Sequence, residues 1–341
     1  MKNLNIITNE RISFNKNFFF SENIDCPSIV DGLSNYFNIK VFGRKSHKIE
    51  KNLILTKKNI FLSNNILNFI KNIILNINFK SSYTLIISIT PYTFLAFFFI
   101  NLFSKKKIYI YLRSDGFKEY EIILGKKFII LYRLMYNYII NRSIIIACEK
   151  NLSLNKSFHL VWPSEISKEW LSTKKKIYNP SFKFLYVGRL KIEKGVYYLV
   201  DLFNNLDKKL FFLNIVGHGK INSRLNSNIK ILDYISKFSD LIKIYDTHSI
   251  FVLPSYTEAH PKVIDEALSR LLPVIIFEDI KHVVGNRKGI FVCKRNVNNF
   301  IQMSEFIFKN YSNIVSDIKK NTLPTKERFI TDLAKIILSE V

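Results

Sequence analysis

The sequence contains little cysteine, and its few cysteines are isolated from one another. Cys26, Cys148 and Cys293 are odd in number, and no two of them have the short spacing of metal-ligating cysteines. The sequence therefore predicts neither a disulfide framework nor a zinc site. Isolated thiols fit a reducing compartment best, so we expect a cytoplasmic protein.

The chain also has few apolar segments that could enter a membrane. Its start reaches a carboxylate, Glu10, too soon to hold the apolar core of a signal peptide. The longest apolar run, residues 92–103, is shorter than the ~20 residues that a spanning helix needs. We expect this run to form a helix under a sheet. The alternative is a surface helix that dips into a bilayer, which the lysines at 105–107 favour.

Segments rich in Gly and Ser or in Pro are missing as well, and no stretch has the low hydrophobicity of a disordered region. The 341 residues, 48% of them hydrophobic, are enough to bury two cores. The sequence therefore predicts two folded domains with a short connection.

Positive charge is what the chain has in excess. It holds 51 Lys and Arg against 27 Asp and Glu, a formal net charge of +24. Residues 1–178 hold 27 basic and 11 acidic residues, net +16, which leaves 24 and 16, net +8, for the rest. This field attracts phosphate-bearing substrates or an anionic membrane surface, and nucleic acid is a weaker candidate. Composition bias from an A/T-rich genome, with its abundant Lys, Asn, Ile and Phe, explains the charge equally well.

Short apolar segments alternate with segments of helical period in both halves, which predicts βαβ units and parallel sheets. In the first half we expect helices over residues 60–77, 91–103 and 121–141, and strands over residues 4–8, 39–42, 83–89, 108–113 and 143–148. Continuous apolar runs such as Ile-Ile-Ile-Ala-Cys are typical of strands that are covered on both faces.

A polar connection over residues 163–180, with a short helix over 165–172, precedes a second series of elements. There we expect strands over residues 182–188, 211–216, 250–253, 274–277 and 290–292. A helix over 196–206 would bury Val196, Leu199, Val200 and Phe203. An amphipathic helix over 325–338 follows Pro324. The prediction is two Rossmann-like domains that face a central cleft: residues 1–165, joined by 325–341, and residues 180–323.

One segment carries two carboxylates at the two ends of a predicted turn. Residues 251–268 comprise an apolar strand, a polar loop and an amphipathic helix, with Glu258 in the loop and Glu266 on the second helical turn. Pro261 suits the start of that helix, and the amides of residues 259–263 could receive anionic oxygens. The alternative is that Glu258 is an ordinary loop acid. Lys262, Glu266 and Arg270, spaced i, i+4 and i+8, would then form a surface ladder of ion pairs.

A second segment, Tyr186-Val-Gly-Arg-Leu-Lys-Ile-Glu-Lys-Gly195, places Arg189 and Lys194 in the loop after a strand. Guanidinium and ammonium groups at that position can neutralise a diphosphate, and arginine can bind it through two hydrogen bonds. A solvated basic loop is the alternative. Gly217-His-Gly219 ends another strand and is a weak signal by itself, since it forms a tight turn in either case.

In the first half, Tyr111-Leu-Arg-Ser-Asp-Gly follows an apolar strand. Arg113 and Asp115 would lie at the carboxyl edge of the sheet, facing the expected cleft. A turn at Asp115-Gly116 without functional role is an equally good interpretation.

These segments together resemble the donor-sugar signature of retaining glycosyltransferases of the group 1 family, the family-4 class with the GT-B fold. The seven residues between Glu258 and Glu266, the preceding Pro-Ser and the upstream Gly-Arg-Leu and Lys-Gly pattern match that family together. The resemblance implies that Arg189 and Lys194 stabilise the donor diphosphate, that Glu258 contacts the donor sugar and that Glu266 holds the ribose. It also implies a nucleotide-sugar site with further contributions from Gly188, Gly217, Gly219, Ser255, His260, Pro261, Lys262 and Val263.

The chain departs from the family pattern at three places. The Gly-rich loop that often follows the first strand is replaced by residues 8–13, and the histidine of many relatives is replaced at Arg113. Arg270 stands close before Pro273, where relatives usually have a glycine. The first two departures make the acceptor-side residues, Arg113 and Asp115, harder to assign.

We expect a retaining glycosyltransferase that moves a sugar from a nucleotide-diphosphate donor to a saccharide or lipid-linked saccharide. Its expected setting is bacterial surface-polysaccharide synthesis, of lipopolysaccharide, O-antigen or capsule, at the cytoplasmic face of the membrane. No Asp-x-Asp metal motif appears in such a context, so we expect Arg and Lys, rather than a metal or another cofactor, to supply the electrostatic stabilisation. Two alternatives stay open: a sugar-nucleotide epimerase of the same fold, and a non-catalytic basic protein that binds membrane or nucleic acid.

Overall fold

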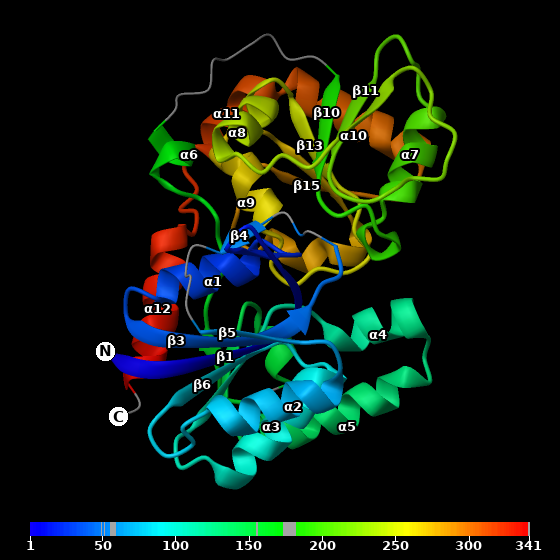
Figure 1. Ribbon diagram of the computed structural model, residues 1–341. Coiled ribbons are helices and arrows are strands. Elements are labelled where there is room, and N and C mark those ends of the chain that lie inside the picture. Colours follow the sequence, from blue (N-terminus) through cyan, green and yellow to red (C-terminus); the bar gives the residue numbers. More distant parts are fainter. Residues whose placement is uncertain (49, 51, 55–58, 155, 173–181, 340–341) are drawn as a thin grey trace. The chain divides into compact units, whose positions relative to one another are not determined.

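The protein is described from a computed structural model that covers residues 1–48, 50, 52–54, 59–154, 156–172 and 182–339. The chain divides into two compact units (Figure 1). Unit 1 comprises Met1–Pro163 and Lys326–Val341, and unit 2 comprises Ser164–Thr325. Each unit has one sheet with helices on both faces, and none of the described helices is long and apolar enough to cross a membrane.

The sheet of unit 1 has nine strands and is mostly parallel. Its strands are β1 (Lys2–Asn15), β2 (Phe18–Ser21), β3 (Phe37–Lys45), β4 (Asn52–Ile54), β5 (Ile60–Ser63), β6 (Tyr83–Ile87), β7 (Ile108–Leu112), β8 (Ile144–Ala147) and β9 (His159–Leu160). The parallel strands lie in the order β5-β3-β1-β6-β7-β8-β9. Their chain order runs one way up to β1 and the other way from β6 onward. Strand β2 pairs with the end of β1, and β4 pairs with β2, both in antiparallel register.

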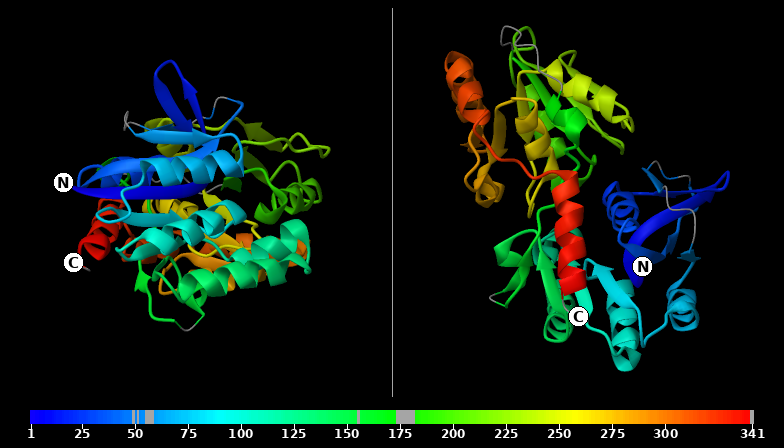
Figure 2. Two further views of the ribbon diagram at one scale, coloured as in Figure 1. Left: turned by 60° about the horizontal axis from the view of Figure 1, so that its bottom comes forward. Right: turned by 90° about the vertical axis from the view of Figure 1, so that its left-hand side faces the viewer.

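Helices cover both faces of this sheet (Figures 1 and 2). They are α1 (Asp25–Leu33), α2 (Ile66–Asn76), α3 (Pro91–Phe103), α4 (Gly116–Leu124), α5 (Phe128–Ile140), the 3₁₀ turn η1 (Lys150–Ser153) and α12 (Lys326–Ser339). The C-terminal α12 packs beside α1, and both bury apolar side chains against one face of the sheet. Helices α2, α3 and α5 lie on the other face.

The structure confirms the predicted helix over 91–103 and the cores of five predicted strands, and it corrects three boundaries in unit 1. Residues 60–63 are a strand rather than the start of a helix, because their apolar run pairs with β3. The helix predicted over 121–141 is two helices, α4 and α5, separated at Gly125 with a φ of +97°. The first strand does not end at residue 8 but continues to Asn15, where Lys16 and Asn17, both with positive φ, form a hairpin turn to β2.

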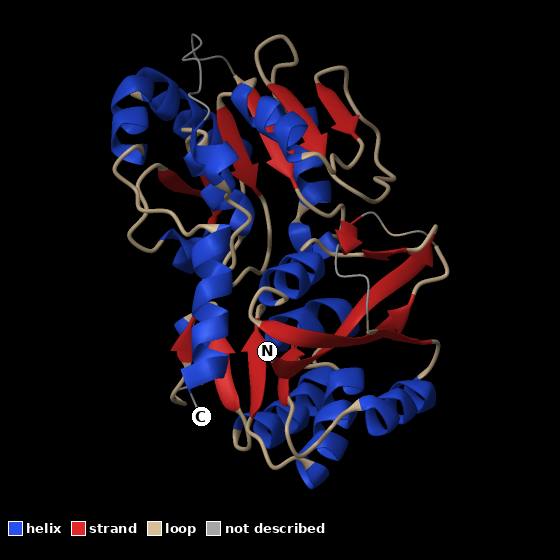
Figure 3. Cartoon of the chain, turned by 60° about the vertical axis from the view of Figure 1, so that its left-hand side comes forward, coloured by secondary structure: helices blue, strands red, loops and turns tan. Residues whose placement is uncertain are grey.

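Unit 2 contains a fully parallel six-stranded sheet (Figure 3). Its strands are β10 (Lys183–Val187), β11 (Phe212–Val216), β12 (Ile229–Leu232), β13 (Ile250–Leu253), β14 (Val274–Phe277) and β15 (Ile290–Cys293). The order β12-β11-β10-β13-β14-β15 is that of a doubly wound Rossmann sheet. The order reverses between β10 and β13, and such sheets bind ligands at the carboxyl ends of the strands beside that point.

Eight helical segments complete unit 2: α6 (Lys168–Ser172), η2 (Ile192–Lys194), α7 (Val196–Asn204), α8 (Phe238–Asp246), α9 (Lys262–Ser269), η3 (Glu278–Val284), α10 (Val297–Lys309) and α11 (Tyr311–Ile318). The predicted strands are confirmed to within two residues at each end, and the four apolar residues predicted to face the core from α7 are all fully buried. The helix predicted over 165–172 begins only at Lys168. Residues 173–180 of the predicted connection lie outside the described residues.

Candidate active site

The loops that follow β10 and β13 lie side by side at the point where the strand order of unit 2 reverses. Gly195 fixes their approach: it has a φ of +67°, and a side chain there would bring a Cβ within 1.9 Å of the Pro254 carbonyl oxygen. Tyr256 in turn donates its backbone N–H to the Glu193 carbonyl. The two loops that carry the predicted donor-binding residues are therefore packed against each other.

Lys194 and Glu258 meet across these loops. The Lys194 Nζ lies 2.6 Å from Glu258 Oε1, and the Ser255 hydroxyl donates to the same oxygen at 2.7 Å. His282, on η3, lies with its Nε2 2.8 Å from the Glu258 carbonyl oxygen. Side chain and backbone of Glu258 are thus both held, and the carboxylate is only 12% exposed. No sequence pattern pointed to a contribution from His282.

Arg189 is less constrained than Lys194. Its guanidinium is 41% exposed and lies 3.8 Å from the Glu193 carboxylate, a distance that leaves most of its donors directed to solvent. The Tyr186 hydroxyl donates to the Arg189 carbonyl at 2.8 Å and so holds the loop backbone at this residue. The site therefore presents an exposed guanidinium beside an ion-paired ammonium group.

The three glycines predicted near the donor have a packing reason to be glycines. A Cβ at Gly217 would lie 1.9 Å from the Gly188 carbonyl oxygen, and one at Gly188 would lie 2.6 Å from the Tyr186 hydroxyl. Gly219 has a φ of +140°. The loops after β10 and β11 can therefore approach each other closely only because these positions carry no side chain.

Glu266 lies on α9 and is buried, with 7% of its surface exposed. The Tyr245 hydroxyl, from α8, donates to its Oε2 at 2.9 Å. Burial raises the pKa of Glu266 to about 7, although the nearby Lys262 and the Tyr245 hydrogen bond act in the opposite direction. This carboxyl group therefore changes its protonation state near neutral pH. Tyr245 could not be predicted as its partner, because the contact joins two separate helices.

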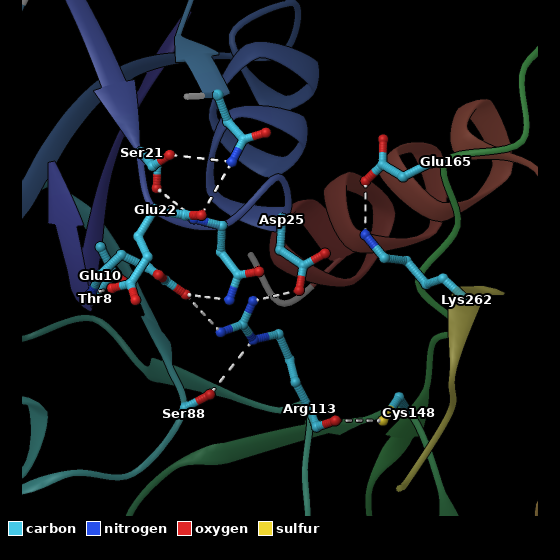
Figure 4. A network of polar contacts seen from close by, with 12 residues as sticks. Thr8, Glu10, Ser21, Glu22, Asp25, Ser88, Arg113, Cys148, Glu165 and Lys262 are labelled. Carbon is cyan, nitrogen blue, oxygen red and sulfur yellow. Dashed lines mark hydrogen bonds and ion pairs between the residues drawn. The ribbon is translucent and has the colours of Figure 1, made fainter. Parts of the chain in front are cut away.

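The alternative surface ladder along α9 does not form. Arg270 is 1% exposed and binds Asp246 through two hydrogen bonds of 2.8 and 2.6 Å, while a third reaches the Trp170 carbonyl at 2.6 Å. Lys262 pairs with Glu165 at 2.9 Å (Figure 4). The departure at Arg270 thus adds a buried link from α9 to α8 and α6.

Pro261 directly precedes α9, which begins at Lys262. In its first turn, Val263 is half-buried and Ile264 is fully buried. His260 lies with its Nε2 2.8 Å from Asp265 Oδ2, and Arg287 donates to the other oxygen of Asp265 at 2.7 Å. Burial alone would raise the pKa of Asp265, but His260 and Arg287 outweigh it and lower that pKa. His260 is therefore fixed at the start of the helix rather than free to rotate.

Arg295 is a site residue that the sequence interpretation missed. Its guanidinium donates to the carbonyls of Pro254 and Ser255, pairs with Asp279 at 2.7 Å, and lies over the rings of Tyr198, Tyr256 and Phe277. It fixes the backbone of the loop that carries Ser255 and Glu258. Its position just after a predicted strand was a signal that could have identified it.

Unit 1 has a polar cluster just after the carboxyl ends of β6 and β7, to which β1 contributes Glu10 and the start of α1 contributes Asp25 (Figure 4). Arg113 donates to Asp25 at 2.7 Å, to Glu10 at 3.0 Å and to the Ser88 hydroxyl at 3.4 Å. Burial alone would lower the pKa of Arg113, but the two carboxylates outweigh it and raise that pKa above its ordinary value. The Arg113 guanidinium is thus held by two carboxylates.

The other predicted acceptor-side residue, Asp115, caps a helix. Its carboxylate accepts the backbone N–H groups of Phe117 and Lys118 at 3.1 and 3.2 Å, at the start of α4. These contacts are explained by the alternative in which Asp115 and Gly116 only shape the chain and have no role in binding. Among the described residues, no group of three or more His, Cys, Asp or Glu side chains is arranged to hold a metal ion.

Residues 181–310 match the family described as glycosyl transferases group 1. A glycosyltransferase of Haemophilus influenzae, itself uncharacterized, is 29% identical over 173 residues, which are 45% of this chain and 49% of that protein. A capsular polysaccharide biosynthesis glycosyltransferase of Staphylococcus aureus is 26% identical over 134 residues, 35% of this chain and 34% of that one. The chain thus spans about half of the first relative's length and a third of the second's.

Solved structures resemble the chain over its whole length. Sucrose-phosphate synthase from Thermosynechococcus elongatus has a TM-score of 0.71 at 13% identity and covers 100% of this chain and 99% of its own. The Anabaena protein Alr3699/HepE, solved in complex with UDP and glucose, has a TM-score of 0.65 at 12% identity, with 100% and 99% covered. Residues 181–310 therefore match the group 1 glycosyltransferases, and the chain has the GT-B fold of two Rossmann-like units.

Proposed function

We propose that the chain is a retaining glycosyltransferase that moves a sugar from a nucleotide-diphosphate donor to a saccharide or lipid-linked saccharide. The observation that carries this proposal is the Lys194–Glu258 pair of 2.6 Å at the carboxyl ends of β10 and β13, with the buried Glu266 on the helix that follows. A diphosphate needs cations and a sugar ring needs hydrogen-bond acceptors, and this arrangement offers both.

Glu266 would hold the ribose hydroxyls of the donor. A carboxylate accepts from two hydroxyls at once, and the Tyr245 hydroxyl occupies only Oε2. Among the described residues, Oε1 has no hydrogen-bond partner, so a ribose hydroxyl could reach it without displacing a protein group. Since the pKa of Glu266 is about 7, donor binding should strengthen as pH rises through neutrality.

Arg189 and Lys194 would neutralise the departing diphosphate. The Lys194 ammonium has three N–H donors and uses one on Glu258, so it can bind a phosphate oxygen without losing that ion pair. The exposed Arg189 guanidinium can bind two phosphate oxygens side by side. Fixed cations of this kind stabilise negative charge that develops on a leaving group.

Glu258 would orient the sugar itself. Its carboxylate is held by Lys194 and Ser255, and its backbone by His282, so its position does not depend on the ligand. Such preorganisation lowers the barrier because little has to move when the donor binds. The capsular relative in Staphylococcus aureus supports surface-polysaccharide synthesis as the setting.

Unit 1 would bind the acceptor. Glu10 and Asp25 both pair with Arg113, so the cluster presents carboxylate oxygens around a guanidinium. Such a cluster suits the hydroxyl groups of a saccharide better than a phosphate. Arg113 would then act by positioning Glu10 and Asp25, and not by binding an anionic acceptor directly.

A turnover assay tests the proposal. Purified protein is incubated with UDP-, GDP- and ADP-sugars, with and without lipid-linked saccharide acceptors, and the release of nucleoside diphosphate is measured. We expect acceptor-dependent release, with retention at the anomeric carbon, that falls at least a hundredfold in Glu258→Gln. The exposed Lys191→Gln variant is the matched control and should keep its activity.

Two outcomes would replace the proposal. Interconversion of the donor to another sugar nucleotide without acceptor would identify an epimerase. Failure to bind any sugar nucleotide, with the protein folded, would leave a non-catalytic protein that uses its basic surface only.

A further inference from the structure

We propose that the outer face of α2, α3, α4 and α5 in unit 1 docks onto a membrane surface that contains anionic lipids. This membrane face goes beyond the proposed reaction, because it does not depend on the donor or on any residue of unit 2. The argument rests on the apolar side chains that it exposes, on the charges around them and on the continuity of the helices.

The exposed apolar side chains of the described residues are concentrated on these four helices. Of the 27 large hydrophobic residues that are exposed, thirteen lie between residues 67 and 134, whereas only six lie in the whole of unit 2. The thirteen are Leu67, Ile74, Leu75, Phe98, Leu102, Phe103, Ile122, Ile123, Leu124, Phe128, Ile130, Leu131 and Leu134. An exposed group of this size marks an interaction surface rather than a random scatter.

The spacing of these residues places them on outward stripes of the helices. On α2, Leu67, Ile74 and Leu75 are exposed while Phe69 and Ile73 are buried. On α5, Ile130, Leu131 and Leu134 are exposed, at 66%, 45% and 66%, and the side chains that face inward are other residues of the helix. The outward residues therefore do not contribute to the core that holds unit 1 together.

The four helices form one continuous surface. Helix α3 packs against both α2 and α5, and α4 packs against α5 (Figure 2). A groove of about 420 Å³ between α2 and α3 is lined by apolar side chains, with Lys71 as its charged residue. The connection between α4 and α5 carries Ile123 and Leu124 on one side of Gly125 and Lys126 and Lys127 on the other, all of them exposed.

Charge identifies the occupant. Residues 66–76, 91–103 and 116–140, which form these helices and the connection between α4 and α5, contain five Lys or Arg and two Glu, a difference of +3. Exposed basic side chains stand among the apolar ones, as Lys71, Lys126, Lys127 and Arg133 do. Apolar side chains mixed with lysines and arginines are what anionic headgroups over acyl chains recognise. A second copy of the same face would instead bring like charges together, so self-association is disfavoured.

Flotation with lipid vesicles tests the membrane face. Full-length protein is mixed with vesicles of phosphatidylcholine, with or without phosphatidylglycerol, and the bound fraction is measured at low and high salt. We expect binding to the vesicles with phosphatidylglycerol that weakens with salt. Lys126→Gln/Lys127→Gln should lower it about tenfold, since each basic residue near the surface contributes.

Matched variants separate this face from a general effect of mutation. Leu131→Glu/Leu134→Glu should lower vesicle binding at least about tenfold, because carboxylates replace side chains that would lie among acyl chains. Leu171→Glu/Leu210→Glu, on similarly exposed leucines of unit 2, and Lys208→Gln/Lys209→Gln should bind as the wild type does. Circular dichroism checks that each variant is folded, and Ile123→Glu provides a second variant of the same face.

Three results would overturn the assignment. They are no binding of the wild type to either kind of vesicle, equal losses of vesicle binding in the variants of the two units, or binding that is equally strong with and without phosphatidylglycerol. A dimer that Leu131→Glu/Leu134→Glu dissociates, without vesicle binding, would assign the face to a second copy instead. Glu266→Ala should bind vesicles normally, so failure of the membrane face and failure of the donor site give different results.

Discussion

Replacing Glu266 with glutamine should stabilise unit 2 above neutral pH while it weakens the binding of a sugar nucleotide. The glutamine side chain has nearly the same shape, and its carbonyl oxygen can still accept the Tyr245 hydroxyl. It cannot ionise. The substitution therefore removes one thing, the cost of holding a charged carboxylate in a buried site.

The size of the effect follows from the change in pKa. Burial raises the pKa of Glu266 from its ordinary 4.5 to about 7. The folded protein therefore holds this proton more tightly than the unfolded chain does. The resulting stability is complete below pH 4.5 and is lost as pH rises to about 7. Between about pH 5 and about pH 8, the wild type should lose on the order of 2 to 3 kcal/mol of unfolding free energy relative to Glu266→Gln.

Urea unfolding followed by tryptophan fluorescence measures this difference in unit 2. The chain has two tryptophans, and Trp170 is fully buried with its ring 5.4 Å from that of Tyr245. In a Trp162→Phe background, Trp170 alone reports on the surroundings of Glu266. Glu305→Gln, an exposed glutamate of the same unit, is the control and should show no pH-dependent difference.

The reasoning fails if the stability difference between wild type and Glu266→Gln is the same at both pH values. That result would mean that Glu266 is ionised in the folded protein at all these pH values, and that its burial is compensated by groups other than Tyr245. A difference of the opposite sign would mean that the folded site prefers the charged form.

Three further predictions concern single contacts of unit 2. Arg270→Met should cost about 3 kcal/mol of unfolding free energy, because it leaves the Asp246 carboxylate without its partner; urea unfolding measures it, and Arg270→Met/Asp246→Asn should recover part of the loss. Gly217→Ala should cost about 2 kcal/mol, because its Cβ would overlap a carbonyl oxygen of the neighbouring loop; an unchanged melting temperature would contradict this. Lys194→Met should weaken nucleoside-diphosphate binding about thirtyfold by titration, and an unchanged affinity would exclude a phosphate contact.

The sequence predicted five of the six strands of unit 2, because each of these is a short apolar run followed by a glycine, a proline or a charged residue, and it missed β12, in which Lys230 interrupts the run. Unit 1 was harder for identifiable reasons. Residues 60–63 are apolar at every position but the last, so their pattern fits a helix and a strand equally well, and only pairing with β3 decides. The extension of β1 past residue 8 depends on the hairpin with β2, which lies within the same polar and aromatic stretch.

The candidate site was predictable where residues act within one loop and not where they act between elements. Motif spacing proposed Glu258, Glu266, Arg189 and Lys194 as candidates, but it did not predict that Lys194 and Glu258 would pair at 2.6 Å. The i, i+4 spacing along α9 suggested a ladder of neighbours, whereas burial directs each of those side chains to a partner on another element. Helical spacing shows which residues share a face and not what covers that face.

Titration calorimetry of UDP, GDP and ADP into the wild type and into Glu266→Ala tests the donor site most directly. The account predicts that one nucleotide binds and that the variant loses at least about 2 kcal/mol of its binding free energy, with the protein still folded. The absence of binding by all three nucleotides, or equal binding by the variant, would contradict it.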